Sequence, residues 1–265
     1  MDSFVAEKEK DTTEAETLAL DEHQEPMDQD DQPEIVTRDI KRRNYTLEIA
    51  AGAILGSLSV LIGIIWDLTL EPAFWGPQFA PGMTWLDIMA VPMLVAFLIF
   101  GIRSGLIAAI IGCTAIIFFP NEVNTGFIAM WPKFIASITM FVVPWIFLKT
   151  ISKKESENKF RNRFKNSSDS LANIGTYAFL MVIAILSRML IMLILNSLVF
   201  GPAFFVVLNI TPTWEFMFAS KALFVKYISL GAGYAAWNGV QGISDAVIAY
   251  LLVFPTKLHK VFKAW

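Results

Sequence analysis

Four polar side chains recur at helical spacing near the C-terminal end of the chain. They are Tyr234, Asn238, Gln241 and Asp245. Their separations of 4, 3 and 4 residues would place them on one face of a helix. Polar residues on one face of a membrane helix either hydrogen-bond to neighbouring helices or line a ligand site. The spacing leaves both roles open.

Charged residues within apolar segments are the second group that could do chemistry. A charge at the centre of a bilayer costs about 2.5–3.5 kcal/mol, so such residues need a partner or a function. Lys133 could either extend to the lipid headgroups or contact a ligand. We expect Arg188 to face the interior, where an ion pair with Asp245 would satisfy both charges without any further function. Asn196 adds an amide late in the segment that holds Arg188.

Residues for metal binding and catalysis are scarce. Cys113 is the single cysteine, and the two histidines, His23 and His259, fall outside the apolar segments. We therefore expect no thiolate cluster and no haem, copper or zinc site within them. The chain has no Gly-Lys-Ser or Gly-Lys-Thr phosphate loop, no Gly-x-Ser-x-Gly and no His-Glu-x-x-His. We accordingly predict no enzyme activity, no catalytic residues, no metal and no bound cofactor.

Six long apolar stretches must position these polar residues. Each is near the roughly 17–25 residues that cross a hydrocarbon core. They are Leu47–Trp66, Leu86–Ile102, Ser104–Phe119, Phe127–Leu148, Leu171–Phe200 and Gly233–Phe254. A composition that is 55% hydrophobic, with 22 Phe and 8 Trp, excludes an ordinary soluble protein. We predict an all-α membrane protein with six transmembrane helices.

The joints between the stretches alternate in charge. Basic residues lie before the first stretch and after the second, fourth and sixth, and the other joints are acidic or nearly neutral. Short basic loops stay on the cytoplasmic side, so both termini are predicted to be cytoplasmic.

Residues 1–40 differ from the rest of the chain. They hold 14 acidic and 3 basic residues, a balance of −11, whereas the remainder carries +8. Residues 1–40 contain too few apolar side chains to offset the entropy cost of folding, and we therefore expect a disordered acidic tail at 1–40. The remainder, 41–265, is expected to form one transmembrane domain. The tail either only solvates the protein or binds a basic partner.

The joint Asp67–Trp85 is long and rich in proline and aromatic residues, including Trp75 and Trp85. It could form part of an interfacial aromatic belt or a lid over a pocket. The first stretch carries Gly52-x-x-x-Gly56 beside Ala53-x-x-x-Ser57, a spacing that lets another helix approach closely. That helix could belong to this chain or to another subunit.

Three parts of the chain resemble the substrate-binding S components of energy-coupling factor (ECF) vitamin transporters. They are Leu86–Pro92 with Phe100–Gly105, then Gly126–Ser137, and finally Met189–Pro202 with Trp237–Ile243. The first is similar to the family's Asp-to-Pro start of helix two and its glycine-bounded turn, although Ile102-Arg103 stands where a proline is common. The last pair is most similar to the riboflavin type. The resemblance covers about residues 45–260.

The resemblance implies a vitamin site near the outer face, with riboflavin as the first candidate, gated by the loop between helices one and two. Trp75 and Trp85 offer stacking faces there. The polar contacts expected for that ligand are Lys133, Asn196, Asn238 and Gln241.

The resemblance also implies a docking surface on helix one for a membrane coupling (T) subunit. The family pattern is Ala-x-x-x-Ala, to which Gly52 and Gly56 are the nearest equivalent, with Ala53 and Ser57 as an alternative register. Two further subunits would use ATP. We expect a multi-pass protein of a prokaryotic cell membrane, with the bilayer and these subunits as partners and no nucleic acid. The alternatives are an integral membrane enzyme acting on lipids and an assembly scaffold.

Overall fold

The computed structural model describes residues 34–66, 68, 88–119, 126–152, 168–200, 203 and 221–262. Within these ranges the regular structure is helical and contains no strand. The chain divides into two units, Met1–Asn44 and Tyr45–Trp265, and the second holds every side chain discussed below. The joint that carries Trp75 and Trp85 lies outside the described residues.

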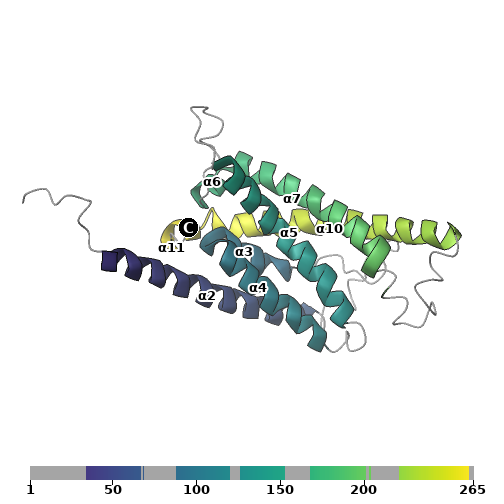
Figure 1. Cartoon of the computed structure of the whole chain (residues 1–265), viewed down its shortest axis with the longest axis horizontal. Coiled ribbons are helices and arrows are strands. Elements are labelled where there is room, and N and C mark those ends of the chain that lie inside the picture. The colour runs from purple at the N-terminus through teal and green to yellow at the C-terminus, as the bar shows by residue number, and fades with distance from the viewer. Residues whose placement is uncertain are drawn as a thin grey trace, which may run out of the picture. The chain divides into compact units, whose positions relative to one another are not determined.

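Ten helical elements follow one another in the described ranges (Figure 1). They are α2 (Glu34–Ile65), α3 (Ala90–Phe100), α4 (Ile102–Thr114), the 3₁₀ turn η4 (Ala115–Phe118), α5 (Gly126–Ser152), α6 (Ser168–Ala172), α7 (Ile174–Leu195), the π-helical turn η7 (Asn196–Phe200), α10 (Lys221–Val253) and α11 (Leu258–Phe262). Helix α2 begins at Glu34, within the range assigned to the tail, and residues 1–33 lie outside the described residues. Helix α10 begins twelve residues before the expected start at Gly233.

Three helices in the described ranges are long and apolar enough to cross a membrane. They are Tyr45–Ile65, Gly126–Thr150 and Ile174–Phe200. Ala90–Phe100 and Ile102–Phe118 are apolar but shorter. The chain therefore has the helices of a membrane protein, while the count of six spans and the side on which the termini lie stay predictions.

Helix α3 forms the centre of the bundle. All eleven of its residues are buried, and the helix is apolar on every side. It packs against α4, α5 and α10. The turn into α4 requires Gly101, because its φ of 94° lies in the left-handed region that side chains disfavour. Beyond the turn, Gly105 lets α4 approach, since a Cβ there would lie 2.9 Å from the Cβ of Phe97.

The outward faces of the surrounding helices are apolar. Ile54 on α2 is 68% exposed, and Leu186 on α7 and Leu251 on α10 are similarly open. Rows of large exposed apolar side chains are unfavourable in water and suit contact with lipid tails. The faces of these three helices thus agree with a bilayer environment.

Local signals explain both ends of α7. Asn173 breaks the helix from α6 with an extended backbone, and its Oδ1 accepts hydrogen bonds from the amides of Gly175 and Thr176 at 3.1 and 3.3 Å. This is the capping role that asparagine favours at a helix start. At the other end the helix widens into η7, where Asn196 and Ser197 are buried.

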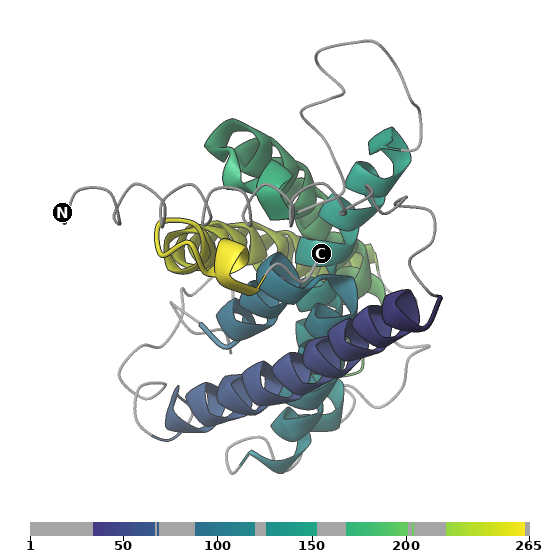
Figure 2. The same ribbon diagram turned by 90° about the vertical axis from the view of Figure 1, so that its left-hand side faces the viewer.

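The C-terminal helix α11 packs against α3 and α6. Figure 2 shows α11 in yellow, in the view from the end of the molecule where it lies. The ring of Phe262 lies 5.1 Å from that of Phe100 at the end of α3. The buried ring of His259 lies 5.0 Å from that of Phe254. The last described helix therefore closes one end of the central helix.

Candidate functional site

An ion pair joins α7 to α10 inside the bundle. Arg188 Nη1 donates to Asp245 Oδ2 at 3.2 Å, and both side chains are only 3% exposed. The two helices pack along each other for much of their length (Figure 1). The pairing considered for these two residues from the sequence is confirmed.

Asn238 extends this pair along α10. Its Oδ1 accepts from Arg188 Nε at 3.1 Å, and its Nδ2 donates to the Tyr234 carbonyl at 2.9 Å. Asn238, Gln241 and Asp245 are all buried, as one helical face turned toward α7 and the core requires. The single polar face expected from the spacing is confirmed.

A third helix contributes a charge to the cluster. Lys133 on α5 is half-buried and interacts electrostatically with Asp245 and Arg188. Helix α5 packs against α7, so three helices bring together polar groups from distant parts of the sequence. We name the set Lys133, Arg188, Asn238, Gln241 and Asp245 the polar cluster.

The surroundings of the polar cluster are apolar and closely packed. A Cβ at Gly239 would lie 2.7 Å from Met189 Sδ, so the glycine allows α7 to approach α10. A Cβ at Gly242 would lie 3.2 Å from Ile185 Cγ1 and 3.6 Å from Arg188 Nη1. These two glycines let Met189 and Ile185 of α7 pack closely against α10 beside the arginine. In such a low-dielectric setting the charges and amides act strongly on one another.

Asn196 lies apart from this set along α7. Eight residues separate it from Arg188, or about 12 Å along a helix axis. It is buried in η7, which contacts both α10 and α5. Three of the residues expected to contact ligand lie in the polar cluster: Lys133, Asn238 and Gln241. Asn196 lies farther along the same three-helix interface. Trp75 and Trp85 lie outside the described residues.

The four small residues on α2 divide between two surfaces. Gly52 and Gly56 are buried against α4: a Cβ at Gly52 would lie 2.9 Å from the Ser104 carbonyl oxygen, and one at Gly56 would lie 3.0 Å from Ala108 Cα. These glycines therefore serve packing within the bundle, the other role considered for them.

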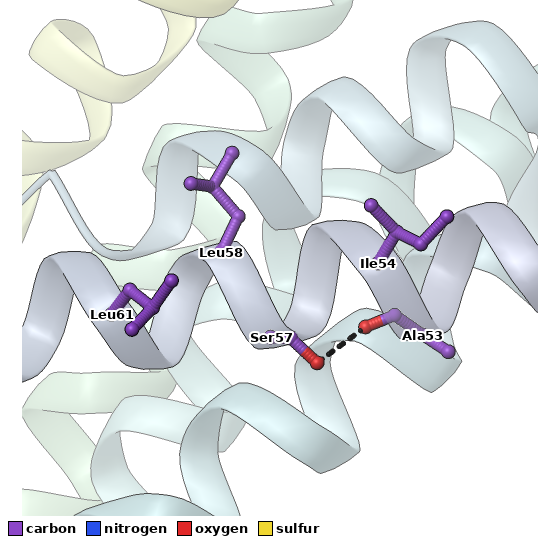
Figure 3. A pocket seen from close by; sticks show the side chains of 5 residues that line it. All are labelled: Ala53, Ile54, Ser57, Leu58 and Leu61. Atoms are coloured by element: carbon purple, nitrogen blue, oxygen red, sulfur yellow. Dashed lines mark hydrogen bonds between the residues drawn. The ribbon is translucent and has the colours of Figure 1, made fainter.

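The alternative register faces outward. Ala53 and Ser57 line a shallow groove of about 470 Å³ together with Ile54, Leu58 and Leu61 (Figure 3). The Ser57 hydroxyl donates to the Ala53 carbonyl at 2.9 Å, which removes its polarity from this surface. The groove is thus an apolar face of one helix.

The expected ligand set omitted Arg188 and Asp245, which lie at the centre of the polar cluster. The sequence signal that marked these two residues was their charge within apolar segments. The sequence did not decide whether the two charges pair with each other. Among the described residues, no group of three His, Cys, Asp or Glu side chains could hold a metal ion. The chemistry available to the polar cluster is hydrogen bonding and charge.

No protein-family model matches this chain, and neither a curated protein nor a solved structure shows detectable similarity to it.

Proposed function

We propose that this chain is the substrate-binding subunit of an ECF-type importer that captures a vitamin, riboflavin first, for uptake. The observation that carries the proposal is the polar cluster, a buried set of amides and charges from three helices within an apolar bundle. Ligand sites combine many apolar contacts with a few polar groups of this kind. Ionisable residues inside membrane segments commonly mark such sites.

The proposal includes six spans with both termini in the cytoplasm. The charge alternation of the joints supports it. Uptake would then require a membrane coupling subunit and two ATPase subunits, since the sequence has no phosphate loop of its own. The outward register of Ala53 and Ser57 is the surface that we assign to the coupling subunit.

One observation favours an assembly scaffold as a second candidate. Arg188 and Asp245 satisfy each other in part, and a buried ion pair can hold two helices in register without any ligand. A scaffold would have no small molecule in the polar cluster. The two candidates therefore differ in whether the purified protein binds a ligand.

The deciding experiment is purification followed by identification of any co-purified small molecule and titration with riboflavin. A yellow preparation with flavin absorbance, or quenching of riboflavin fluorescence, supports the importer subunit. Protein that is folded but gives neither heat nor quenching with riboflavin excludes this ligand.

A matched pair of variants tests the site. Asn238→Ala removes a buried hydrogen-bonding group, which costs about 1–3 kcal/mol, so riboflavin affinity should fall roughly 5- to 150-fold. Val240→Ala changes an outward, 46% exposed residue of the same helix and should leave the affinity unchanged. If Asn238→Ala and the wild-type protein bind riboflavin with equal affinity in titration calorimetry, Asn238 does not contact the ligand.

A further inference from the structure

One oxygen of the central carboxylate lacks a partner. Asp245 is 2% exposed, and its Oδ2 accepts from Arg188. Its Oδ1 is buried and, among the described residues, receives no hydrogen bond. The carboxylate is therefore only half satisfied.

An unsatisfied buried acceptor needs an explanation. Native proteins leave few such atoms, and the cost is larger for a charged group than for a neutral one. The packing around this site is otherwise close, as Met140 and Ile185 at the neighbouring Gly242 show. An intramembrane carboxylate with one free oxygen is thus a position where a hydrogen-bond donor from outside the chain would be stabilised.

We propose that Asp245 Oδ1 accepts a hydrogen bond from a ring N–H group of the bound ligand. This inference rests on the proposed ligand-binding function and adds a chemical requirement to it: the buried part of the ligand carries a donor. Arg188 is then a positioning residue, since its hydrogen bonds at Nη1 and Nε fix the carboxylate and Asn238 together.

Access to Oδ1 requires neighbouring side chains to move. Oδ1 is enclosed in this structure, whereas Lys133 nearby is half-buried and has a long flexible chain. Lys133 is one such neighbour, because it interacts electrostatically with Asp245. The ligand donor takes over part of the stabilisation of the carboxylate.

The test compares riboflavin with 3-methylriboflavin, in which a methyl group replaces the hydrogen of the ring N3–H. Both are titrated into the wild-type protein and into the double variant Arg188→Met/Asp245→Leu. The double change replaces the pair by apolar side chains, which is often tolerated where a single change is not. Thermal unfolding of both proteins confirms that they are folded.

We expect methylation to weaken binding to the wild-type protein roughly 5- to 150-fold. In the double variant the two compounds should bind within about twofold of each other, because the acceptor is gone.

Equal affinities for the two compounds in the wild-type protein would overturn the inference and leave the proposed function standing; a bound water then satisfies Oδ1. Undiminished discrimination in the double variant would also overturn it, since the ring N–H is then recognised elsewhere. No binding of riboflavin to folded wild-type protein would overturn both the inference and the proposed function.

Discussion

Arg188 and Asp245 act as a unit, so their removal is not additive. Changing Arg188 to Met removes the direct ion pair and leaves Asp245 with the electrostatic interaction with Lys133, whereas changing Asp245 to Leu leaves Arg188 without its acidic partner. Each single change should destabilise the fold by about 3–5 kcal/mol. Changing both residues together should reduce the stability by far less than the sum of the two single changes. A double-mutant cycle on thermal unfolding in detergent measures this coupling. Additive losses would mean that water or lipid headgroups already stabilise each charge separately.

A second residue-scale contact can be tested with two tyrosines of one aromatic cluster. Tyr177 Oη donates to the Ala246 carbonyl at 2.7 Å, whereas the Tyr250 hydroxyl lies 3.5 Å from the Ala172 carbonyl. The two rings are 4.9 Å apart. Tyr177→Phe should therefore cost about 0.5–1.5 kcal/mol and Tyr250→Phe much less. The measurement is the thermal unfolding midpoint of each variant. A larger loss of stability in Tyr250→Phe than in Tyr177→Phe would contradict the prediction.

The polar face of α10 could be predicted from residue spacing because helical geometry alone fixes which residues share a face. The pairing of Arg188 with Asp245 could only be offered as one possibility. Spacing within one segment does not say which other segment lies opposite. The place of Lys133 in the polar cluster could not be predicted for the same reason, because it depends on which helix packs beside α7.

At the scale of elements, neighbouring positions on α2 should respond very differently to the same substitution. Gly56→Leu would force a side chain to within 3.1 Å of the Ala108 carbonyl and 3.0 Å of its Cα, so the helices must separate. Overpacking of this kind costs typically 1–3 kcal/mol. Ser57→Leu points outward and should leave the unfolding midpoint unchanged.

The same pair of variants separates folding from assembly. If Ala53 and Ser57 contact a coupling subunit, Ser57→Leu should abolish co-purification with that subunit while riboflavin binding persists. Normal assembly of Ser57→Leu would remove this groove as the docking surface. Loss of riboflavin binding in the same variant would assign Ser57 to the internal architecture instead.

The first long apolar stretch and α5 could be located from apolar length, since both are long and apolar enough to span a membrane. The sequence did not show that α3 would have no lipid-facing side. A helix that is apolar all round carries no preferred face, so its neighbours decide its place. The split of the small residues on α2 was equally hidden, because both registers have the same spacing and only packing against α4 distinguishes them.

For the whole molecule, the predicted topology can be tested with single cysteines in a Cys113→Ala background. Cys113 is the only native cysteine and is buried. Asn158→Cys lies in a basic joint and should be labelled by an impermeant maleimide only after the membrane is opened. Glu215→Cys lies in a joint predicted to face the opposite side and should be labelled in intact cells. Labelling of residue 158 from outside would contradict the topology.

The enclosure of α3 has a consequence for how the protein is made. Phe100 ends α3, and the Phe262 ring that covers it follows about 160 residues later. At roughly 5–20 residues per second, the ribosome needs about 8–30 s to supply that cover. During this interval the Phe100 end of α3 must be covered by lipid or by the insertion machinery, whereas the rest of the helix is covered earlier, as α4, α5 and α10 are made.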